Sequence, residues 1–438
     1  MSSSIPWRRI RRILVYGFVF TLLTLTLRWE HVPPGSFGAR LDRIMRGSYF
    51  DFASWETEAL LDKLGQELSR PQDYLDEAAR KQFVLDYMGL VARIQQAEGE
   101  IARIYVDPDV DDPEAASTEQ RAALDGLRAQ QDKVQGTAEA IIEEQIASVL
   151  QDAGFGVLGQ VLPPVRFRFT PLPQYLIISP RDEIKLIRGA MLRGDLELDY
   201  SEELETQIDA NFDVSSLIVP IGGLAVYPAM LSETSALRWV IGATSHEWVH
   251  HYYFFWLTPL GLHYDSLPDA RTINETAANI AGGAIRDLVL ARYYPEFLPP
   301  PPPPEPDAPT PPPATPEPPA FDFVAEMRET RVNTDRLLAE GKIEQAEDYM
   351  ELRRRVFVEQ GYRLRKLNQA YFAFYGAYAS DPGGGAAGDN PIGNPVQELW
   401  AANPSVRAFI EALSPITSQD MLLALLAKRG IAYPPPTP

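Results

Sequence analysis

The stretch Ser245-His246-Glu247-Trp248-Val249-His250 places two histidines four residues apart, with an acid directly after the first. On an α-helix, residues at this spacing lie on one face with their Cβ atoms about 6 Å apart, so both imidazoles can reach one metal ion. Glu247 lies about 100° further around the helix, where its carboxylate can accept a proton from a water molecule beside the metal. The spacing therefore predicts a helix that combines a metal site with a general base.

The residues around this motif predict that its helix is buried. Mostly apolar and small residues precede it at 237–243, and only aromatic residues follow at 252–256. A helix over residues 234–257 with apolar side chains on nearly every face belongs inside a fold. The alternative interpretation is that His246 and His250 are core histidines without a metal. A third ligand would separate the two, because catalytic zinc sites use three protein ligands and one open position.

Several side chains after the motif are candidates for this third ligand. They are His263, Asp265 and Asp269 in the following loop, and Glu275 near the start of a second predicted helix. We favour Glu275, because small residues at 277, 278 and 281–284 allow its helix, expected over residues 272–294, to approach the first closely. The metzincin arrangement requires a Gly and then a His or Asp within six residues of His250, and the sequence excludes it.

Glu275 also has a second, compatible interpretation. Thr272 and Glu275 have the spacing of a capping box, in which the two side chains satisfy backbone N–H groups at a helix start. Asn279, one turn after Glu275, is a candidate for holding a histidine ring in place from outside the ligand set.

The composition excludes several classes of function. The chain has 438 residues and no cysteine, which excludes disulfides, thiol catalysis and cysteine-bound zinc or iron–sulfur sites. A formal net charge of -20 disfavours nucleic acid as a partner, because the phosphate backbone would be repelled. Histidine and carboxylate side chains therefore remain as the strong metal ligands.

The N-terminus predicts a membrane anchor. Arginines at positions 8, 9, 11 and 12 precede an uncharged, mostly apolar run at 13–27. This excess of positive charge predicts a cytoplasmic N-terminus. We expect a single-pass, uncleaved helix in the cell membrane, with the catalytic region extracytoplasmic. A cleaved signal peptide and a buried helix are the alternatives, although the run lacks the small-residue cleavage site of a signal peptide.

Apolar periodicity predicts an α+β fold that is mainly helical. Strands are expected at 165–169, 175–179 and 216–226, where β-branched and aromatic residues cluster between Pro or Gly residues. The acidic segment 107–113 reads as the turn of a long antiparallel helical hairpin.

We expect five successive segments. They are the anchor and juxtamembrane segment (1–34), the helical hairpin (35–158), a small mixed-sheet metallopeptidase core with the two site helices (159–298), a proline-rich linker (299–320) and a C-terminal helical region (321–438).

Residues 217–290 resemble the gluzincin metallopeptidases, the thermolysin-like group with HExxH on one helix and a Glu on the next. The resemblance implies that His246, His250 and Glu275 are zinc ligands and that Glu247 is the general base. Asn279 stands where the group often has an acid. More loosely, segments 337–343 and 366–371 are similar to the C-terminal part of an uncharacterised bacterial family described as aminopeptidases.

The resemblance also implies roles for neighbouring segments. The group holds its substrate in extended form against a strand before the active-site helix, here within 218–230. Its aminopeptidases grip the substrate amine with a Glu, for which Glu233 is only an approximate counterpart. A further side chain must stabilise the oxyanion of the transition state. The candidates are Tyr371, Tyr375, Tyr378, His251 and His263.

These observations lead us to expect a membrane-anchored, extracytoplasmic metallopeptidase that uses Zn2+ to hydrolyse a peptide or protein substrate. Two alternatives remain. The first is a helical scaffold or binding protein without catalysis, and the second is a zinc hydrolase that acts on a non-peptide amide.

Overall fold

The computed structural model describes residues 35–106, 110, 112–299, 321–362, 364–375, 392–402 and 404–432. Helices dominate this part of the chain and the sheets are small, in agreement with the predicted α+β, mainly helical class. The predicted anchor lies within residues 1–34, which are outside the described residues. Residues 300–320 of the predicted linker are outside them as well. Among the helices that the structure does describe, none combines the length and apolar character needed to cross a membrane.

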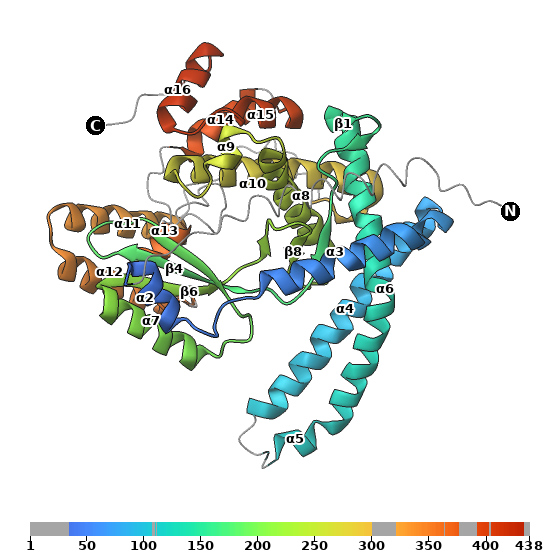
Figure 1. The fold of residues 1–438 in the computed structure, drawn as a ribbon, viewed down its shortest axis with the longest axis horizontal. Coiled ribbons are helices and arrows are strands. Elements are labelled where there is room, and N and C mark those ends of the chain that lie inside the picture. Colours follow the sequence, from blue (N-terminus) through green and yellow to red (C-terminus); the bar gives the residue numbers. More distant parts are fainter. Residues whose placement is uncertain are drawn as a thin grey trace, which may run out of the picture.

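Two long antiparallel helices form an arm that projects from the rest of the molecule (Figure 1). They are α4 (Glu77–Val106) and α6 (Thr118–Leu150), with the short α5 (Pro113–Ala116) between them. Their contact buries the predicted apolar stripes, including Val84, Val91, Ala138 and Ile142. Segment 107–113, where we expected the turn, is only partly within the described residues.

The first sheet has β4 (Gln174–Pro180) in the centre, paired antiparallel with β5 (Arg188–Leu192) and β6 (Val214–Pro220). Helix α7 (Leu198–Phe212) joins β5 to β6. Helix α2 (Phe37–Ile44) packs in the same core, where Leu41 contacts the cluster of Leu176, Leu192 and Ile208. Strand β5 and helix α7 are not predicted from the sequence, because β5 buries only one side chain fully and α7 is mostly charged and polar.

The second sheet lies next to the site helices. Strand β3 (Phe167–Phe169) runs parallel to β8 (Ala229–Leu231), and β7 (Gly223–Leu224) pairs antiparallel with β8 at the sheet edge. The single strand predicted at 216–226 was wrong, because the chain leaves the first sheet after Pro220 and joins the second at Gly223. A two-stranded hairpin, β1 (Gly156–Val157) with β2 (Gln160–Val161), follows α6.

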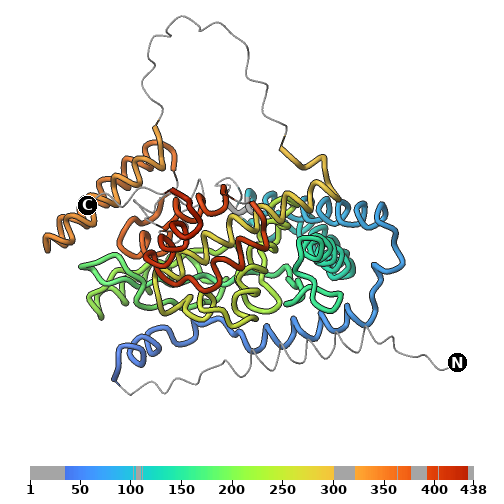
Figure 2. Tube along the Cα trace, turned by 90° about the horizontal axis from the view of Figure 1, so that it is seen from above, coloured from blue at the N-terminus to red at the C-terminus, as the bar shows by residue number. Residues whose placement is uncertain are grey.

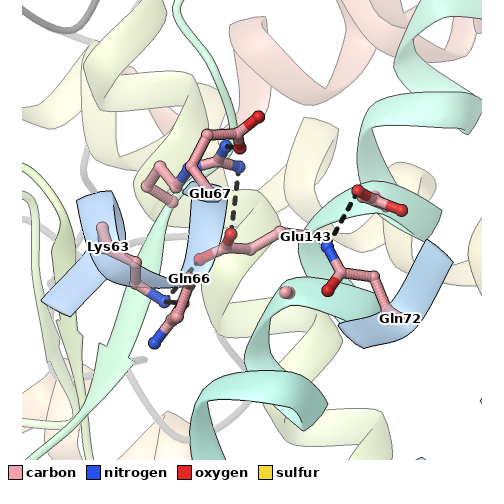
Figure 3. A pocket seen from close by; sticks show the side chains of 8 residues that line it. Lys63, Gln66, Glu67, Gln72 and Glu143 are labelled. Atoms are coloured by element: carbon pink, nitrogen blue, oxygen red, sulfur yellow. Dashed lines mark hydrogen bonds and ion pairs between the residues drawn. The ribbon is translucent and has the colours of Figure 1, made fainter. Parts of the chain in front are cut away.

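Buried carboxylates fasten the arm to the second sheet. Glu143 of α6 accepts a hydrogen bond from Phe167 N (3.0 Å), and Glu139 accepts one from Phe169 N (2.9 Å). Lys63 of α3 (Phe52–Ser69) lies between these two acids, with Nζ 2.7 Å from Glu139 and 2.8 Å from Glu143. Figure 3 shows Lys63 and Glu143 together with their other neighbours. The backbone N–H groups at the free edge of β3 are thereby hydrogen-bonded to side chains, so they are not available to pair with another strand.

Helices α8 (Leu237–Phe255) and α10 (Pro268–Tyr293) lie side by side in the largest core, with α9 (Pro259–Leu262) between them in sequence. Helix α10 begins at Pro268, one turn before the predicted start. The capping-box interpretation of Thr272 and Glu275 was therefore wrong, because both residues lie inside the helix. Thr272 Oγ1 instead donates to Pro268 O (3.1 Å).

The C-terminal helices cover two different parts of the body. Helices α11 (Phe323–Ala339), α12 (Ile343–Glu359) and α13 (Gln369–Tyr375) form a core with β4 and β6 that contains Ile177, Met350 and Phe372. Helices α14 (Gly393–Ala402), α15 (Val406–Leu413) and α16 (Gln419–Lys428), red in Figure 2, pack against the core of α10. Both site helices are thus enclosed by elements from distant parts of the chain.

Candidate metal centre

His246 and His250 project from the same face of α8, as their spacing predicts. Their ring centroids are 4.7 Å apart, and their Nε2 atoms approach to 3.0 Å. Both side chains are mostly buried, with exposed fractions of 17% and 11%. The helical period alone explains this pairing, because residues at i and i+4 stack on one side of a helix.

Glu275 of α10 completes a group of three ligand-type side chains. Its Oε2 atom lies 3.5 Å from His246 Nε2 and 3.7 Å from His250 Nε2, and one ligand atom from each of the three residues lies within 4.8 Å of the others. The helices approach this closely because α10 has glycine at the crossing. A Cβ at Gly282 would lie 2.8 Å from the backbone N of His246.

The surroundings of Glu275 fit a bound cation. Its Oε2 is buried and has no well-formed hydrogen bond in the structure. A buried carboxylate oxygen without a partner is costly, and here it points at two imidazole nitrogens. A metal ion among the three atoms would satisfy all of them, so this group could hold one.

Asn274 fixes the orientation of the His250 ring. Its Nδ2 donates to Leu260 O (3.3 Å), which leaves Oδ1 to accept a hydrogen bond from Nδ1–H of His250 at 2.7 Å. With the proton on Nδ1, the lone pair of Nε2 faces Glu275. This is the arrangement that metal-ligating histidines usually have. No short sequence pattern marks Asn274, because its role depends on where α9 and α8 lie relative to α10.

Asn279 contacts the other histidine, which agrees with its predicted supporting role. Burial alone lowers the pKa of His246, but the nearby Glu275 and Glu247 and the hydrogen bond with Asn279 raise it above its usual value. Burial lowers the pKa of His250 to about 4. Burial opposes ionisation of Glu275, yet the two histidines and Tyr264 bring its pKa down to about 2. Glu275 is thus ionised and His250 is neutral near pH 7, which are the states in which they bind a metal. The raised pKa of His246 means that a metal must compete with a proton at that ring.

Glu247 lies beside this group and outside it. Its side chain is buried, and burial raises the pKa of Glu247 to about 7. It points to the edge strand of the second sheet, since a Cβ at Gly223 would lie 2.5 Å from Glu247 Oε1. A carboxyl group with a pKa near neutrality can both accept and return a proton. The structure therefore places Glu247 beside the pair of His246 and His250 and not among the ligands, as the sequence spacing predicts.

The other predicted ligands lie elsewhere. His263 is exposed and pairs with Ser266 Oγ (3.1 Å), and Asp269 accepts a hydrogen bond from Gln419 N (3.0 Å). Of the metal-ligand candidates within the described ranges, only His246, His250 and Glu275 converge. The preference for Glu275 over His263, Asp265 and Asp269 agrees with this geometry.

Most of the predicted oxyanion candidates lie away from the three ligands. Tyr371 and Tyr375 belong to the core between α13 and the first sheet, and Tyr378 is outside the described residues. His251 Nε2–H donates to Val226 O (2.8 Å). The tyrosine that does reach the group is Tyr264, which donates its hydroxyl to Glu275 Oε1. Nothing in the sequence marks Tyr264, because it is a single residue in the turn between α9 and α10.

Glu233 is engaged by the arm. Both of its carboxylate oxygens contact Arg128 Nη1, at 2.9 and 2.7 Å, and Arg128 Nη2 also donates to Glu98 of α4. A carboxylate that is neutralised in this way is poorly suited to bind a substrate amine.

Comparison of the chain with protein-family models, with curated proteins and with solved structures finds no match.

Proposed function

We propose that the protein is a zinc metallopeptidase, with His246, His250 and Glu275 as the metal ligands and Glu247 as the general base. The observation that supports this most strongly is the buried Glu275 Oε2, which has no hydrogen bond of normal geometry and faces two histidine Nε2 atoms. Glu247 lies next to these ligands without joining them. A group of this composition and geometry matches what metal-assisted hydrolysis needs.

The donor set favours zinc over harder cations. Two imidazoles and one carboxylate form a common catalytic zinc site with one position left open, whereas magnesium and calcium prefer oxygen ligands alone. When bound, zinc supplies Lewis-acid activation of water and of a substrate carbonyl group. Glu247 would take a proton from the attacking water and pass it to the amine that leaves.

We place the substrate along β7. This strand is at the sheet edge, and Gly223 lies directly beside Glu247. An extended peptide that pairs with the strand would bring a backbone carbonyl near the metal ligands. The ion pair between Glu233 and Arg128 favours cleavage within a chain over recognition of a free N-terminal amine. The arginines at 8–12 and the apolar run at 13–27 support an N-terminal anchor and an extracytoplasmic site.

Peptide hydrolysis by the full-length chain and its Glu247→Gln variant tests this proposal. The variant should retain its zinc, because Glu247 is not a ligand, and lose about 10²- to 10⁴-fold in turnover through loss of the base. A peptide with an acetylated N-terminus should be cleaved at the same rate as the same peptide with a free N-terminus, because no free amine needs to be recognised. Undiminished turnover in Glu247→Gln would show that the base is elsewhere. Zinc-dependent cleavage of non-peptide amides without cleavage of peptides would favour the alternative function, a zinc hydrolase that acts on a non-peptide amide.

A further inference from the structure

The two carboxylate oxygens of Glu275 have different surroundings. Oε1 accepts a hydrogen bond from the hydroxyl of Tyr264. Oε2 accepts no hydrogen bond of normal geometry and faces the Nε2 atoms of His246 and His250. Tyr264 therefore engages one carboxylate oxygen, and the other, Oε2, is the one that the histidine Nε2 atoms approach.

Tyr264 is held in this position by three elements. Its turn follows α9, which lies so close to α8 that a Cβ at Gly261 would be 2.6 Å from the carbonyl carbon of Tyr253. The Tyr264 ring stands edge to face with the ring of His250, with centroids 5.8 Å apart. The guanidinium of Arg271, on α10, lies 5.5 Å from the centre of the Tyr264 ring. The hydroxyl is thus directed by contacts from α8, α9 and α10.

We propose that Tyr264 is a positioning residue that makes Glu275 a one-oxygen metal ligand and so keeps a coordination position open. This inference rests on the proposed function, since it presumes that the three ligands bind a metal. A carboxylate can bind a cation through one oxygen or both. In a catalytic site with three protein ligands, a second carboxylate oxygen would compete for the position that the reaction needs. A hydrogen bond to Oε1 disfavours that competition.

The test compares Tyr264→Phe with wild type, in the full-length chain. Zinc affinity should fall by about 10- to 100-fold, the usual effect of removing a group that orients a ligand. With Co2+ as the probe, the visible absorption should weaken, because binding of Glu275 through both oxygens raises the coordination number from four to five. A purely structural role would change the melting temperature of the metal-free protein and leave the Co2+ spectrum unchanged.

Tyr253→Phe is the matched control. The Tyr253 hydroxyl is buried and has no hydrogen-bond partner in the structure, so its removal should leave affinity and spectrum unchanged. If Tyr264→Phe does not fold, Arg271→Met replaces it. Because this change also removes a positive charge that acts on His250, the Co2+ spectrum alone is the readout, and its absorption should weaken to a smaller extent. Wild-type affinity and spectrum in the folded variant would overturn this inference and leave the proposed function standing. Absence of metal binding by wild type would overturn both.

Discussion

Gly282 lies directly against the backbone of His246. A Cβ at residue 282 would be 2.8 Å from His246 N and 2.9 Å from its Cα, closer than real Cβ contacts. This contact is what brings Glu275, two turns earlier on α10, within reach of both histidines. The separation of α8 and α10 at this point therefore sets the dimensions of the candidate metal site.

Gly282→Ala should weaken zinc binding and destabilise the fold. The added methyl group would push α10 away from α8, and overpacking of this kind costs about 1–3 kcal/mol. Zinc titration and thermal unfolding measure the two effects. Gly283→Ala is the control, since the nearest atom to its Cβ, Arg286 Nη2, lies 3.7 Å away. Alanine there should be neutral or stabilise the helix by up to about 1 kcal/mol. Equal effects of the two substitutions would contradict this account.

Asn274→Ala should reduce zinc affinity by about 10- to 100-fold, because the His250 ring loses the acceptor that fixes its tautomer. Asn274→Asp keeps an acceptor oxygen for Nδ1–H and should retain an affinity near that of wild type or above it. Competition with a chelator of known affinity measures both variants. Similar losses in the two variants would mean that the contact with Leu260, and not that with His250, is the important one.

Lys63→Met should be strongly destabilising, because it leaves Glu139 buried without a counter-charge and Glu143 with Arg166 as its only cationic partner within the described part of the chain. The exposed fractions of these acids are 1% and 2%, and breaking a buried ion pair on one side typically costs about 3–5 kcal/mol. Arg336→Ala, which breaks a largely exposed pair with Glu340, should cost about 0.5 kcal/mol at most. Denaturant unfolding would compare them, and equal costs would show that Lys63 does not neutralise these acids.

The metal-ligand candidates can be predicted from the sequence better than the residues that hydrogen-bond to them, for a physical reason. The spacing of His246 and His250 is local, so the helical period alone brings them together. The small residues around Gly282 indicate a close helix crossing, and this favours Glu275. Asn274 and Tyr264 act through the placement of α9 and its turn against two other helices, which no short pattern encodes.

Errors in the fold prediction arose where local patterns have more than one interpretation. Thr272 and Glu275 have capping-box spacing, yet α10 begins at Pro268, a residue well suited to the first turn of a helix. The apolar run at 216–226 reads as one strand, although Ile221 and Gly222 carry the chain from one sheet to the other. Helix α7 is mostly polar because only one side of it packs on the first sheet, so its apolar pattern is weak.

Zinc binding by His246, His250 and Glu275 is best tested by the zinc content of the purified full-length chain. We predict one zinc per chain in wild type and a severe loss in Glu275→Gln, because a neutral amide is a much poorer ligand than a carboxylate. Thr272→Ala, which removes only a hydrogen bond within α10, should keep its zinc. Wild-type protein that is folded yet metal-free after preparation with excess zinc, or Glu275→Gln with full zinc content, would contradict the account.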